Sequence, residues 1–257
     1  MALLKKNMKG PAVANLIQRL VAIGELPAGT SGDLFDSVVL AVVKRFQAKH
    51  MGPNGLPLVI DGEVGPLTQF ALSVALGELP EPPNNSMPLP QINTAPAGAS
   101  IAGWNALQVA KAEMAAGAKE IGGDNRGPFC AKYLALTGLG EGNPWCAAFV
   151  SFCFDAGNPG AMPYTPTAGA RATRNAFKAK GWAYDATFEN PPIAGDIIIW
   201  WRGAMNGTLG HIGIVAGYEH GIVHTIEGNR TPRVEAFSYT FGKINNLLGF
   251  GRARPVG

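Results

Sequence analysis

The sequence has few of the features that place a chain in a disulfide-rich or metal-binding class. Its 257 residues include only three cysteines and four histidines. Three cysteines are too few for a disulfide framework. There is no CxxC or HExxH motif, and no pair of histidines has the spacing of metal ligands. We therefore expect neither a metal ion nor another cofactor.

Long apolar runs and strong net charge are also missing. No apolar stretch reaches the roughly 18 residues of a membrane-spanning helix, so we expect no stable membrane insertion. The formal net charge is only +3, and no basic run with interleaved aromatic residues suggests nucleic acid as a partner. The first residues, MALLKKNMKGPAV, lack the apolar segment of a Sec signal, so we expect synthesis in the cytoplasm. We expect a monomer.

Composition divides the chain into three regions. Residues 79–100 are rich in Pro, Asn, Ser and Ala and have no hydrophobic periodicity, which is typical of a semi-rigid linker. This linker separates residues 1–78 from residues 101–257, and each of these regions has enough apolar residues for its own core. We expect an α+β protein with a small three-helix N-terminal domain and a larger domain that contains an antiparallel sheet.

Residues 1–78 carry three helical patterns. PAVANLIQRLVAIG has apolar residues at helical spacing. FDSVVLAVVKRFQ offers Asp36 as an N-cap and an apolar stripe behind it. Pro66 follows a Gly-rich turn and suits the first position of a third helix.

The most informative segment is NPWCAAFVSFCF, which begins at Asn143. Asn143 suits the N-cap and Pro144 the first position of an apolar helix, so Cys146 falls in the first turn. There a thiol faces unpaired backbone N–H groups and the positive end of the helix dipole, which lower a cysteine pKa. The same N–H groups could bind the oxyanion of an acyl-transfer intermediate. Cys146 is thus a candidate nucleophile, and a buried core cysteine is the alternative.

A base for this nucleophile lies in LGHIGIVAGYEHGIVHTIEGN, which is typical of two strands around a Gly-rich turn. If residues 217–221 form the loop, His211 and Glu227 lie directly opposite on one face, with Cβ atoms about 4.5–5.5 Å apart. Asn229 lies on the same face, diagonal to His211. A base with one or two orienting groups is the arrangement of a catalytic triad. A slip of one residue would destroy this alignment.

The other cysteines and His224 suggest no chemistry. Cys130 precedes the cysteine helix and Cys153 lies two turns after Cys146, so we expect both to be core thiols. His224 is expected on the strand face opposite Glu227.

The second half of the chain resembles the CHAP domain family of cysteine, histidine-dependent amidohydrolases and peptidases, within a wider papain-related group. The resemblance covers roughly residues 101–254. It rests on four motifs in the family's order: PWCAAFVSF around Cys146, AGDIIIW at Ala194–Trp200, GHIGIV at Gly210–Val215, and EGN at Glu227–Asn229. It implies a papain-like fold in which the cysteine helix packs on an antiparallel sheet.

The resemblance also implies roles for site residues. Cys146 would be the nucleophile and His211 the base. Glu227 would orient His211, and Asn229 would be an auxiliary polar group. Members of the family mostly cleave amide bonds in peptidoglycan, and a minority cleave other amides.

Residues 4–76 resemble the small three-helix peptidoglycan-binding domain found in many cell-wall hydrolases. The matching residues are Gly32, Phe35–Asp36, Ala41–Val42, Phe46–Gln47, Asp61–Gly62, Gly65 and Thr68. The apolar members of this set also fit a purely structural role in the core.

Two further residues are candidates for substrate binding. Trp145, next to Cys146, is expected to line the cleft. Asn125, in the polar loop GDNRGP, is expected to contact a peptide stem, and a turn held by its side chain is an equal alternative. The acidic residues near this loop, Glu120, Asp124 and Glu141, are too few to favour a structural calcium ion.

The sequence therefore predicts a peptidoglycan hydrolase: an N-acetylmuramoyl-L-alanine amidase or an endopeptidase that uses a cysteine nucleophile. The simplest role is that of a phage endolysin, made in the host cytoplasm and released to the cell wall in the periplasm. The alternatives are an injected antibacterial effector, a bacterial autolysin of the same chemistry, and a catalytically inactive wall-binding protein.

Overall fold

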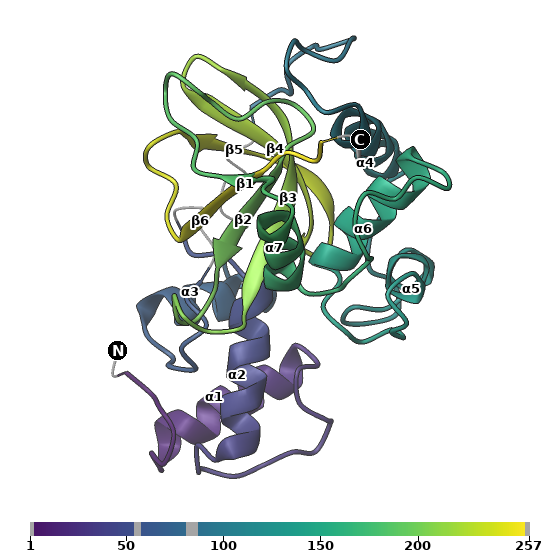
Figure 1. Ribbon diagram of the computed structural model, residues 1–257. Helices are drawn as coiled ribbons and strands as arrows, with labels where there is room; N and C mark the ends of the chain where they lie inside the picture. Colours follow the sequence, from purple (N-terminus) through teal and green to yellow (C-terminus); the bar gives the residue numbers. More distant parts are fainter. Residues whose placement is uncertain (1–2, 54–57, 81–86, 255–257) are drawn as a thin grey trace. The chain divides into compact units, whose positions relative to one another are not determined.

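The computed structural model describes residues 3–53, 58–80 and 87–254. Within these ranges the chain forms seven helices and one six-stranded sheet, so the predicted α+β class is confirmed (Figure 1). The chain divides into two compact units, Met1–Asn84 and Asn85–Gly257. In the described part of the chain, no helix combines the length and apolar character needed to cross a membrane.

The first unit contains α1 (Pro11–Ala22), α2 (Ser37–Lys49) and α3 (Pro66–Ala75). Helices α1 and α3 begin with proline, whose missing N–H is not needed in the first turn. Asp36 caps α2 as predicted, and its Oδ1 accepts two backbone N–H bonds of 2.9 Å. The three helices enclose an apolar core that includes Leu16, Leu20, Phe35, Phe46 and Leu72.

A buried amide joins α2 to the turn before α3. The Gln47 side chain donates from Nε2 to Asp61 Oδ1 at 2.8 Å, to the Glu63 carbonyl at 2.8 Å and to Thr68 Oγ1 at 3.2 Å. Its Oε1 accepts from the Gly62 N–H at 2.8 Å. Both ends of the amide are therefore satisfied, as a buried polar group requires.

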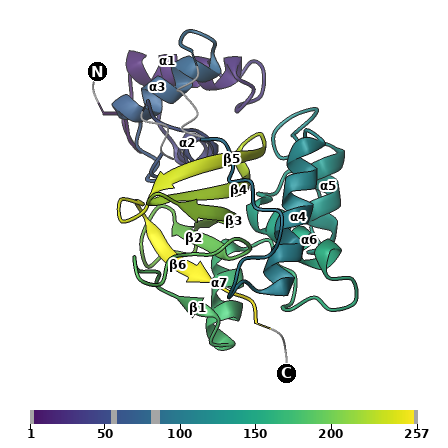
Figure 2. The ribbon, with the colours of Figure 1, turned by 90° about the horizontal axis from the view of Figure 1, so that it is seen from above.

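The second unit places helices beside an antiparallel sheet. The helices are α4 (Ile101–Ala115), α5 (Pro128–Ala135), α6 (Cys146–Gly157) and α7 (Ala170–Ala179). The strands are β1 (Ala183–Tyr184), β2 (Ile197–Trp201), β3 (Gly210–Glu219), β4 (Ile222–Thr231), β5 (Arg233–Thr240) and β6 (Leu247–Gly251). Their order is β1-β6-β2-β3-β4-β5, and every neighbouring pair is antiparallel. Helices α4, α5 and α6 lie together on one side of the sheet (Figure 2).

Helix α6 lies at the centre of the second core. It is apolar on nearly all sides and packs against isoleucines of the sheet, among them Ile199, Ile212 and Ile214. A helix without a polar face is stable only when it is buried in this way. The packing fixes the beginning of α6, and hence Cys146, against β3 and β4.

The hairpin formed by β3 and β4 differs from the predicted register. His220 and Gly221 form a two-residue turn, both with positive φ, so the predicted loop of residues 217–221 is wrong. The ladder then shifts at a bulge between Val215 and Gly217, and Gly213 lies opposite Glu227. At the site, the shift from the predicted pairing is two residues. Because side chains alternate with a period of two, His211 and Glu227 still share a face.

Part of the expected linker belongs to the second unit. Leu89 and Ile92 pack against its core, and the Met87 N–H donates to a serine hydroxyl of β5 at 3.0 Å. The predicted linker, residues 79–100, is therefore too long, because its second half is held by apolar contacts. Residues 81–86 lie outside the described residues.

Candidate active site

Cys146 is the first residue of α6, as the first-turn prediction required. The predicted cap is wrong, however: Trp145 is the N-cap residue, and the Asn143 side chain donates instead to the Gly140 carbonyl at 3.0 Å. The Cys146 thiol lies among backbone N–H groups of the helix start and of Ile212, the residue that follows His211. The nucleophile candidate therefore contacts the backbone next to the base candidate, where α6 packs on β3.

The predicted lowering of the thiol pKa is outweighed in the structure. Cys146 is only 7% exposed, and burial raises the pKa of its thiol. The charge of Arg202 and the backbone N–H groups of Ala147 and Ile212 lower the pKa, as the sequence argument assumed, but the net shift is upward. The resting thiol is consequently protonated at neutral pH.

His211 contacts Glu227 through a buried hydrogen bond. The distance between His211 Nε2 and Glu227 Oε2 is 2.8 Å, and the two side chains are 4% and 0% exposed. The His211 ring also lies beside the Trp200 ring, with 5.5 Å between centroids. One face of the imidazole is thereby fixed by an aromatic ring and one nitrogen by a carboxylate.

Gly213 makes this contact possible. It lies directly opposite Glu227, two residues beyond His211 on the same strand face. A Cβ at position 213 would lie 2.6 Å from Glu227 Cγ. The absence of a side chain therefore lets Glu227 lean across the gap and reach His211. This accounts for the second glycine of GHIG in physical terms.

The second oxygen of Glu227 is held by hydroxyl groups. Thr225 Oγ1 donates to Glu227 Oε1 at 2.6 Å, and Tyr239 Oη donates to the same atom at 2.7 Å. Arg230 lies 3.7 Å from Oε2 and donates to Tyr239 Oη. The guanidinium of Arg230 stacks over the Phe237 ring at 4.1 Å. The carboxylate thus has partners on both oxygens.

These contacts determine the protonation of the pair. Burial raises the pKa of the Glu227 carboxyl, but the charge of Arg230 and the bonds from His211 and Thr225 outweigh it, so the pKa lies well below its usual range. Burial lowers the pKa of His211, and Glu227 offsets this only in part. An ionised carboxylate can only accept, so the hydrogen lies on His211 Nε2 and the lone pair on Nδ1.

Asn229 acts on the cysteine helix and not on His211. It adopts φ of 62° at an irregularity of β4, and its Oδ1 accepts the Trp145 N–H at 2.9 Å. That N–H belongs to the residue immediately before Cys146. The expectation that Asn229 lies diagonal to His211 on the strand is therefore corrected, because β4 loses its regular pairing between Glu227 and Thr231.

Gly228 completes the docking of β4 on the beginning of α6. A Cβ at this position would lie 2.4 Å from Trp145 Cζ3, so only glycine lets the indole approach the strand. The three residues of EGN therefore have separate tasks. Glu227 holds the base, Gly228 makes room for Trp145, and Asn229 binds the backbone next to Cys146.

The two predicted substrate-binding residues are buried. Trp145 is fully buried among aromatic rings, and its Nε1 donates to Glu120 Oε1 at 2.9 Å. Asn125 is 1% exposed, and its Oδ1 accepts from Asn229 Nδ2 at 2.8 Å. Neither side chain lines an open surface, because each is drawn inward by a polar partner. The Asn125 side chain thus binds a residue of β4 and not its own turn, which differs from both expected roles.

Glu120 is a site residue that sequence reasoning missed. Its Oε1 accepts from Trp145 Nε1 and, at 3.2 Å, from Asn229 Nδ2, while its Oε2 accepts the Asn125 N–H at 2.8 Å. Its partners are up to 109 residues away in the chain. No local motif reveals such a hub. Glu141 is engaged similarly, since it accepts the Gly127 N–H at 2.7 Å.

Arg202, Arg230 and Tyr239 were also not predicted. All three are buried, and their charges or dipoles act on His211, Glu227 or Cys146. A buried arginine outside any motif gives no sequence signal of proximity to a carboxylate. Within the described ranges no group of three His, Cys, Asp or Glu side chains could hold a metal ion. Cys130 and Cys153 are fully buried in the core.

Comparison with known proteins finds one family that matches part of the second unit. Residues 138–229 match the CHAP domain family. This region contains Cys146, His211, Glu227 and Asn229, and it is shorter than the span of residues 101–254 over which the sequence resembles that family. No curated protein and no solved structure matches the chain. A CHAP domain implies cysteine-dependent amidase or peptidase activity with peptidoglycan as the substrate.

Proposed function

We propose that the protein is a peptidoglycan hydrolase in which Cys146 is the nucleophile, His211 the general base and Glu227 the orienting group. The observation that carries the proposal is the buried hydrogen bond between His211 and Glu227, on a strand whose Ile212 N–H lies near Cys146 Sγ. A glutamate with a depressed pKa and an imidazole that is neutral at pH 7 are suited to general base catalysis.

The first step is attack on an amide carbonyl. Cys146 Sγ bonds to the carbonyl carbon while its proton moves to His211 Nδ1, the nitrogen that Glu227 leaves free. Because both groups are neutral at rest, proton transfer accompanies attack and does not precede it. The carboxylate of Glu227 stabilises the imidazolium that forms.

The second step releases the amine. Backbone N–H groups at the start of α6 lie near Cys146 Sγ and are placed to donate to the tetrahedral oxyanion. The intermediate collapses to a thioester as His211 gives its proton to the leaving nitrogen. His211 then removes a proton from water, which attacks the thioester and yields a carboxylate and the free thiol.

A matched pair of cysteine variants tests this assignment. Cys146→Ser should abolish release of soluble fragments from purified sacculi, because a hydroxyl gives up its proton to a base far less readily than a thiol. Cys153→Ser, two turns along the same helix, should keep the activity. Near-wild-type hydrolysis by folded Cys146→Ser would remove Cys146 from the mechanism.

We also propose that the first unit is a peptidoglycan-binding domain that holds the enzyme on its insoluble substrate. Its separate core and the capped α2 support an independent module, and the resemblance of residues 4–76 to wall-binding domains supports the ligand. The benefit would be a high effective concentration of enzyme at the wall.

Truncation tests the anchor, and the structure decides where to cut. A chain that begins at Asn85 keeps Leu89 and Ile92 on the second core. It should hydrolyse soluble muropeptides normally and lose most activity on intact sacculi. Residues 1–84 should sediment with sacculi without hydrolysing them. A folded fragment that stays in solution at moderate salt would contradict wall binding.

The role we propose is that of an endolysin, made in the cytoplasm and acting on the wall after a separate partner permeabilises the membrane. The combination of a hydrolase with a wall anchor supports this role. Expression in bacterial cells should leave them intact until their membrane is permeabilised, and lysis should then require Cys146. Lysis without permeabilisation would favour an autolysin or an injected effector.

A further inference from the structure

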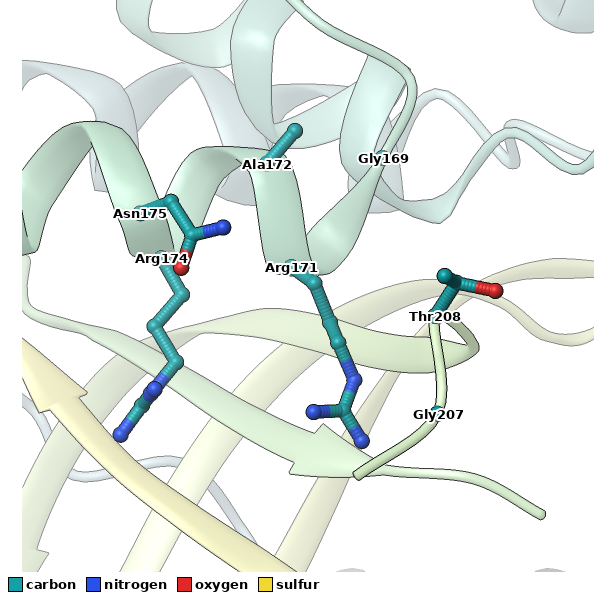
Figure 3. Close-up of a pocket in the computed structure, with 7 residues that line it drawn as sticks. All are labelled: Gly169, Arg171, Ala172, Arg174, Asn175, Gly207 and Thr208. Atoms are coloured by element: carbon teal, nitrogen blue, oxygen red, sulfur yellow. The ribbon is translucent and has the colours of Figure 1, made fainter. Parts of the chain in front are cut away.

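A pocket of about 420 Å³ lies between α7 and the loop that joins β2 to β3. Two half-buried arginines of α7, Arg171 and Arg174, line it together with Asn175 and the loop residues Gly207 and Thr208. Figure 3 shows both arginine side chains extending from α7 in the same direction, with Gly207 and Thr208 beyond Arg171. The pocket thus offers cationic and amide groups at an open surface.

Arg171 shapes the pocket. Its Nε donates to the Leu209 carbonyl at 2.9 Å, and its Nη2 donates to the carbonyls of Ala204 and Met205 at 3.1 and 2.9 Å. Three bonds to one loop fix the loop against α7. Most donors of the Arg171 guanidinium are therefore used by backbone carbonyls. Its main contribution to ligand binding is to hold the loop that forms one side of the pocket.

Arg174 has hydrogen-bond donors that could bind a ligand. Its Nε donates to the Leu248 carbonyl at 3.1 Å. A guanidinium has five N–H donors, so the others can serve a ligand. In the described part of the chain neither Arg174 nor Arg171 forms an ion pair with a carboxylate. Helix α7, ARATRNAFKA, contains no acidic residue that could neutralise them.

The pocket lies close to the candidate active site. Its rim residue Thr208 lies four positions before Ile212, which in an extended chain is roughly 13 Å, and the Ile212 N–H lies near Cys146 Sγ. Gly210, between them, faces α7: a Cβ there would lie 3.2 Å from Arg171 Cγ. A peptide whose scissile amide lies at Cys146 could therefore reach the pocket with a group two or three residues away.

The loop that Arg171 holds also exposes apolar side chains. Met205 is 62% exposed and Leu209 is 49% exposed, and both belong to the loop that Arg171 holds. Such side chains favour a ligand that combines a negative group with methyl or methylene groups. A short peptide rich in alanine with a free carboxylate has this chemistry, whereas an inorganic anion does not.

We propose that this pocket is a subsite for a free carboxylate of the peptidoglycan stem peptide, with Arg174 as the binding residue and Arg171 as the positioning residue. The inference rests on the proposed hydrolysis of peptidoglycan and adds a specificity for that substrate. A planar guanidinium is suited to a carboxylate because it can donate two parallel hydrogen bonds.

The test compares two soluble muropeptides of one sequence, one with free stem carboxylates and one with these carboxylates amidated. For the wild-type chain, amidation should raise KM about tenfold and leave kcat unchanged, the size expected for one charge-assisted contact. Arg174→Gln should raise KM for the free-carboxylate substrate by a similar factor and should no longer distinguish the two substrates.

Lys178→Gln is the matched control, because it removes the same charge from the next turn of α7 without lining the pocket. It should keep the wild-type preference. The proposal is overturned if Arg174→Gln retains the wild-type KM for both substrates, or if the wild-type chain is indifferent to amidation.

A binding measurement separates this inference from the proposed function. Full-length Cys146→Ser should bind the free-carboxylate muropeptide more tightly than the amidated one in calorimetric titration. The double variant with Arg174→Gln should lose the difference. If the wild-type chain cleaves neither muropeptide while this difference persists, the hydrolase assignment fails and the carboxylate site stands. If cleavage occurs without the difference, only the carboxylate site fails.

Discussion

A buried polar cluster lies in each of the two units, and the two clusters are built from different chemistry. Around Gln47, a neutral amide meets a turn and the start of a helix, and both its donor and its acceptor are satisfied. Around Glu227, an ionised carboxylate contacts an imidazole, an arginine and two hydroxyl groups.

The difference teaches how a buried polar group can be interpreted. A satisfied neutral amide costs little to bury and holds two segments together. Buried charges are expensive to desolvate, so their presence needs a further reason. The lowered pKa values of Glu227 and His211, and the contact of Cys146 with the residue next to His211, supply such a reason, because proton transfer requires groups of this kind.

Of the substitutions that test this difference between the clusters, Glu227→Gln should cause the largest loss of activity. The amide cannot stabilise an imidazolium as a carboxylate does, so kcat on a soluble muropeptide should fall on the order of a thousandfold. The control is Glu235→Gln, which makes the same change on the facing residue of β5. If the Glu227 variant is folded and as active as this control, the charged cluster is structural like that of Gln47.

Gly213→Ala should have an intermediate effect. The added methyl group would lie 2.6 Å from Glu227 Cγ and push the carboxylate away from His211. We expect a loss of roughly tenfold to a hundredfold in kcat, as for a displaced positioning group. Gly217→Ala, on the same strand, would meet Pro90 Cγ at 2.9 Å and should cost stability without this loss of kcat. Equal kcat values for the two variants would contradict the space-making role of Gly213.

Gln47→Leu, in the first unit, should lower stability and leave activity unchanged. Removal of the amide leaves the Gly62 N–H and its neighbours without partners, so the first unit should lose about 1–3 kcal/mol of stability. Hydrolysis of a soluble muropeptide should not change. Thermal unfolding of this variant is to be compared with that of Gln18→Leu, which alters an exposed residue of α1. A fall in kcat for Gln47→Leu would contradict the claim that the Gln47 cluster is purely structural.

The smallest expected effect is a displaced pH profile. Burial lowers the pKa of His211, and only neutral His211 can accept the thiol proton. Activity should therefore persist as pH falls below 6.5, the ordinary pKa of histidine, and decline only when the imidazole finally protonates. The acid limb of kcat/KM against pH measures this midpoint. A midpoint at or above 6.5 would contradict a buried neutral base.

The helix starts and the shared face of His211 and Glu227 could be predicted from the sequence, because they depend on residues that are close in the chain. Asp36 and Pro66 mark helix starts through first-turn chemistry that involves only their neighbours. The apolar pattern that follows Cys146 predicts a helix, and the structure confirms that the thiol lies in its first turn. His211 and Glu227 were placed on one face because alternation along a strand survives a shift of two residues.

Long-range contacts and backbone irregularities account for the rest. The bulge between Val215 and Gly217 and the two-residue turn at His220 depend on positive φ values and packing that composition does not reveal. Asn143 satisfies the local rule for a cap, yet Asn229 receives the Trp145 N–H from 84 residues away. Tertiary packing decides between such alternatives, and Glu120 is the residue that shows it most clearly.

The most direct test of the central claim is digestion of purified sacculi in water enriched in ¹⁸O, followed by mass spectrometry of the released muropeptides. Hydrolysis through a Cys146 thioester predicts fragments with a new amino group and one ¹⁸O in a new carboxylate, and none of these from Cys146→Ser. Label in a reducing sugar, or the same products from the Cys146 variant, would contradict a cysteine amidohydrolase.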